Sequence, residues 1–130
     1  MVVFFNGEPQ KSEYKKFKIR TVKGVNDVGM LREVLTRRFK NDWQKPDIIF
    51  VDGGEGQVNA AKSVLRIFKL NIPVIGLAKG LSRKNDRLVF DKTDLELHRV
   101  AETFKDIFIR VRDEAHRFAI TYHRKIRRIN

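Results

Sequence analysis

An aspartate at the end of an apolar run is the first residue of this chain whose position suggests chemistry. Asp52 follows DIIFV (47–51) and precedes the string GGEGQ (53–57). A short apolar run bounded by turn residues predicts a buried strand, and ligands of open α/β sheets gather at the carboxyl ends of such strands. The glycines allow a sharp turn and the close approach of a large ligand. Asp52 is therefore a candidate for metal-assisted phosphodiester chemistry, which needs a hard oxygen ligand.

The residues around Asp52 leave three interpretations open. In the first, Asp52 caps a helix after a tight strand–helix turn. In the second, the glycines form a dinucleotide or phosphate loop, although Asn59 stands where the third glycine of G-x-G-x-x-G belongs and no G-K-[ST] follows. In the third, Asp52 is a metal-binding carboxylate, and this role requires a partner elsewhere in the chain.

His116 is the candidate partner for Asp52. Arg112, His116, Ile120 and His123 follow one another at spacings of four, four and three, which places them along one line of a helix. That line borders an apolar stripe, so we expect His116 to be half-buried and to lie near Asp52 at the strand ends. An imidazole can bind a divalent metal or protonate a leaving 3′ oxygen. The alternative is a boundary histidine or a member of a helix salt bridge.

The charge of the chain favours a polyanionic partner. Lys and Arg number 28 against 16 Asp and Glu, which gives +12 at pH 7. Each phosphate that Lys or Arg neutralises releases a condensed counterion, so we expect nucleic acid rather than an anionic membrane or an acidic protein. The side chains expected to contact the DNA backbone are Lys79, Arg112, Arg117, Arg124 and Lys125.

Composition excludes several classes of protein. Hydrophobic residues make up 42% of the 130 residues and charged residues 34%, which is typical of a folded domain rather than a disordered chain. No apolar run approaches the ~18–20 residues of a membrane helix, and the start lacks the features of a secretion signal. The absence of cysteine excludes disulfides and thiolate chemistry and fits the reducing cytoplasm.

Short strands and one helix are expected in the first third of the chain. Residues 2–5 predict a strand, and a loop rather than a tight turn is expected across 7–14. YKKFKIRTV (14–22) alternates apolar and basic residues, which predicts an antiparallel strand with one solvated face. Apolar residues at helical spacing predict a helix from Val28 to Phe39, with Arg38 among the residues that stay outside.

The rest of the chain predicts the strands and helices that position Asp52 and His116. Strand 47–51, a helix bearing Val58 to Phe68 and strand 73–78 form a βαβ unit, so the two strands should be parallel and the first of them central. A short strand is expected at 88–90. A last helix, from about Leu97 to Arg128, should lie on the sheet. The predicted fold is α/β in one domain, with antiparallel strands, then a parallel βαβ unit, then a covering helix.

Four segments of the chain resemble one known family. KSEYKKFKI (11–19), PDIIFVDGGEGQVNAA (46–61), PVIGLAKG (73–80) and RDEAHRFAITYHRK (112–125) are similar to the C-terminal endonuclease domain of UvrC, the incision subunit of bacterial nucleotide excision repair. The resemblance covers nearly the whole chain in the family's order. It implies a ribonuclease H-like mixed sheet, Mg²⁺ or Mn²⁺ as cofactor, and Asp52 and His116 as catalytic and metal-binding residues. It further implies a cytoplasmic enzyme that cuts damaged double-stranded DNA on the 5′ side of a lesion, with a UvrB-type partner.

The chain departs from the family pattern in one respect. The family has another catalytic aspartate on a first strand, and no acid precedes Glu8 here. Paired helix–hairpin–helix modules, which follow the domain in the family, are also absent. We therefore expect residues 1–130 to be a partial domain without its first strand, inactive or nearly so by itself. The alternative function is a non-catalytic basic DNA-binding module, and a more distant one is a nucleotide-binding α/β domain.

Overall fold

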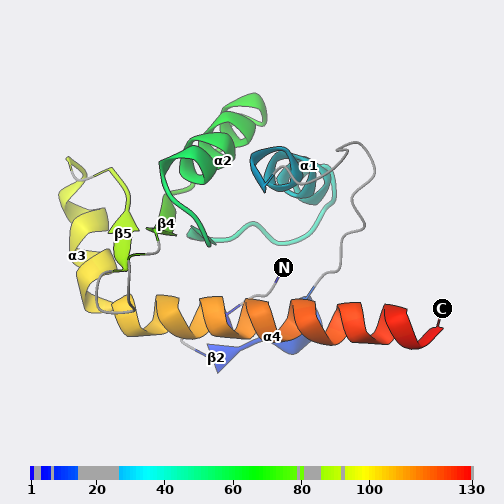
Figure 1. Cartoon of the computed structure of the whole chain (residues 1–130). Coiled ribbons are helices and arrows are strands. Elements are labelled where there is room, and N and C mark those ends of the chain that lie inside the picture. Colours follow the sequence, from blue (N-terminus) through cyan, green and yellow to red (C-terminus); the bar gives the residue numbers. More distant parts are fainter. Residues whose placement is uncertain are drawn as a thin grey trace. The chain divides into compact units, whose positions relative to one another are not determined.

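Helices and strands alternate along the chain and form the mixed α/β fold that the sequence predicted (Figure 1). The computed structural model describes residues 1, 4–6, 8–14, 27–78, 80, 86–91 and 93–129, with only the backbone of residues 5, 13 and 122–129. The elements divide into two compact units. The first unit comprises residues 1–18 and 104–130, and the second comprises residues 19–103.

The second unit contains a three-stranded sheet in the order β3-β4-β5. Its strands are β3 (Ile49–Val51), β4 (Val74–Ala78) and β5 (Arg87–Val89). β3 and β4 are parallel, as predicted, and β5 is antiparallel to β4. Within the described residues the central strand is β4, and the expectation that the strand ending at Val51 is central stays a prediction. The first four residues of β4 are buried, because this strand has a neighbour on each side.

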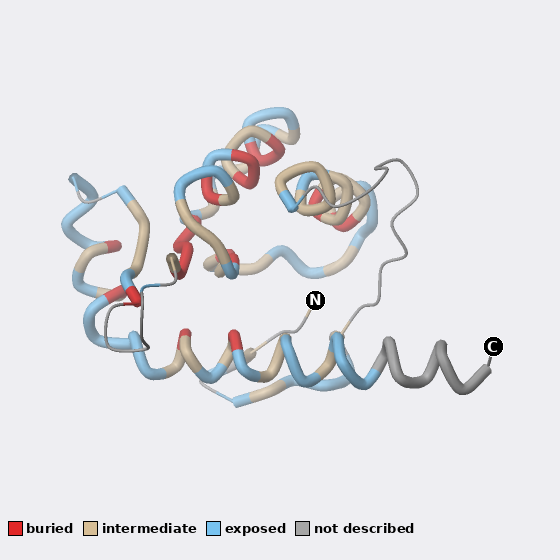
Figure 2. Tube along the Cα trace, in the orientation of Figure 1, coloured by how far each residue is buried: buried red, intermediate tan, exposed pale blue. Residues whose placement is uncertain are grey.

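Two helices share one hydrophobic core with this sheet. α2 (Glu55–Ile67) packs against β4, and α1 (Asp27–Phe39) lies beside α2 (Figure 1). The buried positions of α2 and β4 are red in Figure 2. The spacing of apolar residues predicted both helices, because the positions that repeat every three or four residues are the buried ones. The core residues are Leu35, Ile49, Val51, Val58, Ala61, Val64, Leu65 and Val74.

Arg38 corrects one detail of the prediction for α1. The sequence pattern placed this arginine outside, but it is buried, at 8% exposure. Its Nη2 donates a hydrogen bond to the carbonyl oxygen of Gln44 at 2.8 Å. Its guanidinium also lies 5.5 Å from the centre of the Phe39 ring. A charged group is tolerated there because a buried guanidinium that is hydrogen-bonded and stacked retains polar and cation–π contacts.

The first unit begins with a tight hairpin where a loop was expected. β1 (Phe4–Phe5) and β2 (Glu8–Pro9) pair in antiparallel fashion, with Phe5 opposite Glu8. Two residues therefore join the strands, and Asn6 has the positive φ of 52° that Asn tolerates in such turns. A 3-10 turn, η1 (Lys11–Glu13), follows. Of the strand predicted for residues 14–22, only Tyr14 lies within the described residues.

The long helix predicted for Leu97 to Arg128 is two helices. α3 (Leu95–Thr103) belongs to the second unit, and α4 (Lys105–Ile129) belongs to the first. Neither proline nor glycine lies at the break, and the apolar spacing continues across it. The break coincides with the boundary between the two units, where the packing partners change, so local sequence could not reveal it. The expected placement of α4 on the sheet stays a prediction.

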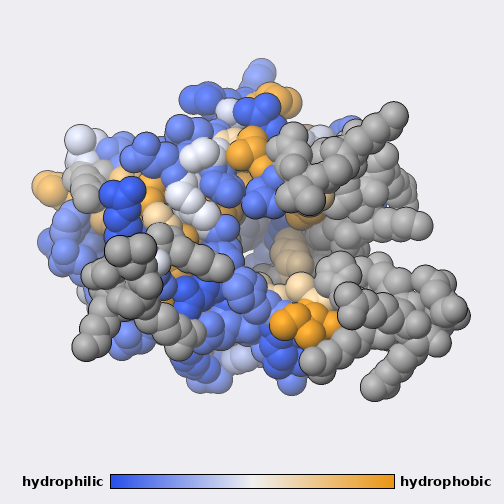
Figure 3. Space-filling view, in the orientation of Figure 1, coloured by the Kyte–Doolittle hydropathy of each residue, from blue (hydrophilic) through white to orange (hydrophobic). Residues whose placement is uncertain are grey.

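The described surface is mainly polar. Hydrophilic residues cover most of the described part of the face in Figure 3, and the hydrophobic areas there are small and separate. None of the helices in the described ranges combines the length and apolar character needed to cross a bilayer.

A close approach of two backbones fixes the end of β3. Gly76 on β4 pairs with Val51 on β3. A Cβ at position 76 would lie 2.5 Å from the carbonyl oxygen of Gly53 and 2.6 Å from Cγ2 of Val58. Both distances are too short for a real Cβ, so only glycine lets the chain turn so closely over β4 after Val51.

Gly76→Ala should therefore destabilise the chain. Overpacking against a backbone carbonyl and a buried valine should lower the free energy of unfolding by about 1–3 kcal/mol, measured by urea denaturation at pH 7. Gly56→Ala is the matched control, because its Cβ would meet nothing nearer than Val28 Cγ2 at 3.8 Å. Alanine also favours the first turn of α2, so this variant should be neutral or more stable. Equal stabilities of the two variants would contradict the close approach.

Candidate functional site

Asp52 lies where the sequence predicted, at the carboxyl end of β3. It follows Val51 directly, and its side chain is exposed. Because β3 and β4 are parallel, their carboxyl ends meet at the same edge of the sheet. The backbone turns at once after Asp52, with the N–H of Gly53 donating to the carbonyl oxygen of Val51 at 3.1 Å. The carboxylate is thus presented at an accessible edge by a rigid strand and a short turn.

The helix that follows does not use Asp52 as its cap. α2 begins at Glu55, and its N-cap is Gly54, which supplies no side-chain hydrogen bond. Asp52 is therefore not the N-cap residue of α2. The first N–H groups of α2 have no partner within the helix, so the loop joins an exposed carboxylate to a helix N-terminus. Gln57 folds back onto this loop, because a Cβ at Gly53 would meet its Cδ at 2.5 Å.

The connection from β4 to β5 starts at the same edge of the sheet. Gly80 donates its backbone N–H to Oδ1 of Asp86 at 2.8 Å, and Asp86 is buried. This carboxylate holds the two ends of the connection together. The sequence analysis did not single out Asp86, and its only signal was an acid immediately before a short strand. Lys79, expected to contact phosphate, lies outside the described residues.

One line of α4 contacts the N-terminal segment. Arg110 is 3.7 Å from Glu8 through Nη2 and Oε2, and its guanidinium lies 6.0 Å from the centre of the Phe4 ring. Four residues on, Glu114 accepts a hydrogen bond from Tyr14. Phe118, four residues further, meets the Tyr14 ring edge to face at 5.1 Å. Residues four apart lie above one another on a helix, so these contacts form a seam along α4.

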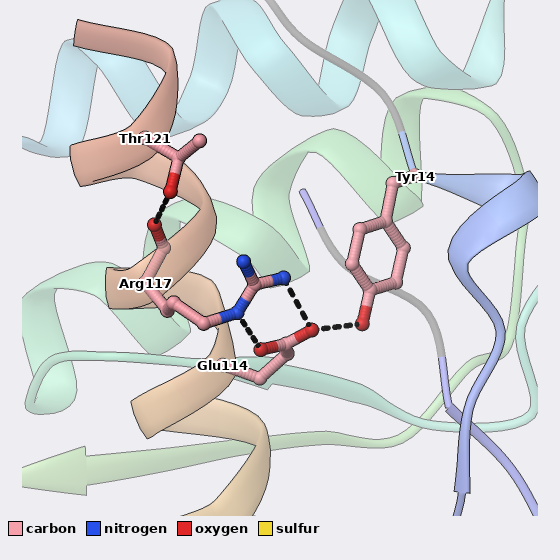
Figure 4. A network of polar contacts seen from close by, with 4 residues as sticks. All are labelled: Tyr14, Glu114, Arg117 and Thr121. Atoms are coloured by element: carbon pink, nitrogen blue, oxygen red, sulfur yellow. Dashed lines mark hydrogen bonds and ion pairs between the residues drawn. The ribbon is translucent and has the colours of Figure 1, made fainter. Parts of the chain in front are cut away.

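Tyr14, Glu114 and Arg117 form a polar network at the middle of this seam (Figure 4). The Tyr14 hydroxyl donates to Oε2 of Glu114 at 2.7 Å. Arg117 donates to the same carboxylate twice, from Nε at 2.5 Å and from Nη2 at 2.9 Å. Its third nitrogen, Nη1, points away from Glu114 (Figure 4). Paired charged hydrogen bonds of this kind hold both groups in a defined geometry.

The network shifts the titration of both acidic groups. The hydrogen bonds from Arg117, and next that from Tyr14, lower the pKa of Glu114 to about 2, although burial opposes the shift. Burial first, and then the hydrogen bond to Glu114, raises the pKa of Tyr14 to about 12. The carboxylate is thus charged and the phenol neutral across the physiological range, which keeps the donor and the acceptor in place.

His116 lies on the other side of α4 from this seam. It is two residues from Glu114, and two steps along an α-helix turn a side chain through about 200°. The histidine is exposed rather than half-buried as expected. Arg112, one turn earlier, is 6% exposed, and its Nε is 3.5 Å from Oδ1 of Asp113. Within the described residues, His116 therefore shares a face with Arg112 and not with Arg117.

The remaining sequence-predicted residues are placed only in part. Arg124 and Lys125 lie on α4, but their side chains are outside the description. Asp52 belongs to the second unit and His116 to the first, so their convergence stays a prediction. Tyr14, Glu114 and Gly76 are the positions that the sequence analysis did not assign to the site, since each has its role only through a partner distant in sequence.

Divalent metal ions are often bound by several protein side chains that lie close together. Among the described side chains, no three acidic or histidine residues come together in a ready-made metal site. Mg²⁺ does not require one, because it keeps several waters and binds through one or two carboxylates together with substrate phosphates. The exposed carboxylate of Asp52 fits that mode of binding.

The chain is similar to known proteins along nearly its whole length. The model of the family described as the UvrC RNAse H endonuclease domain matches residues 1–120. The chain is 46% identical over 140 residues to UvrABC system protein C of Lachnospira eligens, which covers 98% of this chain and 23% of that protein. Its namesake from Streptococcus thermophilus is 46% identical over 137 residues, covering 100% and 23%. That of Clostridium acetobutylicum is 39% identical over 146 residues, covering 98% and 23%.

The network around Glu114 predicts a pH-dependent contribution to stability. The folded-state pKa of Glu114 lies below its ordinary value of 4.5, so its stabilisation is present above about pH 4.5 and is lost as the pH falls towards 2. Glu114→Gln should lower the free energy of unfolding by about 1 kcal/mol at pH 7. The difference from the unsubstituted chain should shrink between pH 5 and pH 2.5 in urea denaturation.

Glu96→Gln is the control for charge alone, because Glu96 is an exposed residue in the first turn of α3. Glu96→Gln removes the same charge from the other unit, and at pH 7 it should lower the free energy of unfolding by less than Glu114→Gln does. A difference between Glu114→Gln and the unsubstituted chain that stays constant from pH 7 to pH 2.5 would refute the role assigned to the carboxylate.

Proposed function

The chain belongs to the UvrC RNase H endonuclease domain family, and from this premise we propose that it is a DNA endonuclease domain of nucleotide excision repair. The reaction is the hydrolysis of one phosphodiester bond on the 5′ side of a lesion in double-stranded DNA. The chain spans about a quarter of the length of the relatives it matches, at 23% of each of them. Lesion recognition and a UvrB-type partner are therefore proposed for the whole protein, which we place in the cytoplasm.

The position of Asp52 is the observation that carries this proposal. An exposed carboxylate stands at the carboxyl end of β3, on a turn that Gly76 and Gly53 hold against β4. A hard oxygen donor on a rigid element is what Mg²⁺ or Mn²⁺ prefers. We propose Asp52 and His116 as protein ligands of such an ion. When bound, the ion would polarise the scissile phosphate and lower the pKa of a water molecule.

His116 has the properties of a proton carrier. Its imidazole is exposed on α4, where a DNA backbone can reach it. Histidine changes its charge near neutral pH, so it can donate a proton to the leaving 3′ oxygen. This role supplements its proposed role as a ligand, and the two require different protonation states of the ring.

The basic side chains hold the DNA. A formal charge of +12 favours binding to phosphates through the release of counterions. Arg117 suits this task, because Glu114 fixes two of its nitrogens while Nη1 points outward (Figure 4). We assign the same role to Lys79, Arg124 and Lys125. Arg112 was expected to share it, but its side chain is 6% exposed, so its guanidinium is not available to a DNA backbone. These contacts position the backbone and carry no sequence information, as expected of a nuclease that is directed by lesions.

Asp52→Asn should separate cleavage from DNA binding. Removing a direct ligand should weaken Mn²⁺ binding at least about 10-fold, measured by calorimetry. Mutation of a residue that only hydrogen-bonds to a metal ligand already lowers metal affinity by about that factor. Nicking of supercoiled plasmid with Mn²⁺, followed at high protein concentration, should fall with it. Affinity for duplex DNA, measured at two salt concentrations, should change little because phosphate contacts to Lys and Arg dominate it.

Asp47→Asn is the matched control. Asp47 is exposed and lies just before the opposite end of β3, so this variant should keep the metal affinity and nicking of the unsubstituted chain. DNA binding without Mn²⁺ binding or nicking in any variant would instead favour the non-catalytic DNA-binding module.

A further inference from the structure

We infer that Tyr14 and Glu114 are positioning residues that set the rotation of α4 about its axis relative to the N-terminal segment, and thereby the direction of His116 relative to that segment. This inference rests on the proposed function, because it concerns the residue assigned there to proton transfer and metal binding. It follows from how the N-terminal segment is attached to α4.

The attachment uses one side of the helix over two turns. Arg110, Glu114 and Phe118 all contact the segment that precedes residue 15, and they span about 12 Å of the helix axis. Contacts at several heights along one line oppose tilting of the helix, and a directional hydrogen bond among them opposes its rolling about that line. The side chain of His116, about 200° around from Glu114, turns with the helix as a rigid part of it.

The hydrogen bond from the Tyr14 hydroxyl to Glu114 is the most directional of these contacts. The ion pair of Arg110 with Glu8 joins two exposed side chains, at 52% and 76% exposure, and such pairs hold geometry weakly. Glu114 is shielded, with 13% of its side chain exposed, and Arg117 holds it from within the same helix. The bond from Tyr14, 100 residues away in sequence, therefore ends on a carboxylate that is already fixed relative to α4.

Arg117 cannot by itself set the rotation of α4. Its bonds to Glu114 lie within one helix, so they turn with the helix and do not resist its rolling. Arg117 fixes the orientation of the Glu114 carboxylate, and the hydrogen bond from Tyr14 connects that carboxylate to the N-terminal segment. Deleting one oxygen atom, in Tyr14→Phe, should release the rotation while leaving the ring in place against Phe118.

The test compares two variants that each lose one hydroxyl from the same side of α4. Tyr14→Phe removes the bond between the segment and the helix. Thr121→Val is the control, because the Thr121 hydroxyl donates only to the carbonyl oxygen of Arg117 within α4, at 2.9 Å (Figure 4). The readouts are the NMR signal and relaxation of the His116 imidazole, and kcat and KM for plasmid nicking. His98, in the second unit, serves as the internal reference.

In Tyr14→Phe, α4 should be free to roll, so the His116 ring should lose its fixed orientation. The population of molecules in which α4 keeps its rotation should fall roughly 10-fold, because a hydrogen bond to a charged group has been lost. The kcat for nicking should fall several-fold with KM for DNA unchanged. Thr121→Val should leave both readouts unaltered, and the His98 signal should be the same in all variants. Glu114→Gln, which keeps an oxygen for Tyr14, should retain more order at His116 than Glu114→Ala.

Equal His116 relaxation in Tyr14→Phe and Thr121→Val would overturn the inference. A change at His98 as large as that at His116 would also overturn it, because it would indicate increased mobility of the whole chain. The proposed function fails separately, if the unsubstituted chain does not bind Mn²⁺ or if its nicking survives His116→Ala. The NMR comparison needs no cleavage, so it decides the anchoring of His116 in that case as well.

Discussion

The approach of Gly53 to Gly76 is the constraint on which the candidate site depends. β3 ends at Val51, and the chain must turn over β4 within three residues to begin α2 at Glu55. The carbonyl oxygen of Gly53 fills the space that a side chain on Gly76 would occupy. This contact keeps the turn short, and the short turn leaves Asp52 exposed at the edge of the sheet rather than engaged as a helix cap.

α4 meets a different requirement, because one side of it is bound to the N-terminal segment while His116, on another side, is exposed. Its seam with the N-terminal segment combines a ring contact, an exposed ion pair and the shielded network around Glu114. The network is the directional part, because its donors and acceptor keep their protonation states across the physiological range. His116 lies away from the seam, so the contacts that stabilise the helix do not compete with its imidazole for a ligand or substrate.

Much of the second unit could be predicted from local pattern. The alternation of apolar runs and helical spacing located α1, α2, β3 and β4, and the parallel pairing of β3 with β4 followed from the connection between them. The errors have a common origin. Arg38 was predicted to be outside, because helix periodicity carries no information about its hydrogen bond to the carbonyl of Gln44. The break after Thr103 was not predicted, because the apolar spacing continues across it. Both features depend on packing partners that the periodicity of a single segment does not reveal.

The sequence by itself determined the fold class, the basic character of the chain and the identity of its candidate chemistry. Asp52 could be singled out because strand, glycine and helix signals are local and meet at that residue. Only the tertiary structure decided which groups hold the candidate residues. The bond from Tyr14 to Glu114 joins residues 100 positions apart, and the contact of Gly76 with Gly53 crosses from one strand to the turn after another. Such contacts leave no local pattern, because the side chain or the missing Cβ acquires its role only when folding brings its partner beside it.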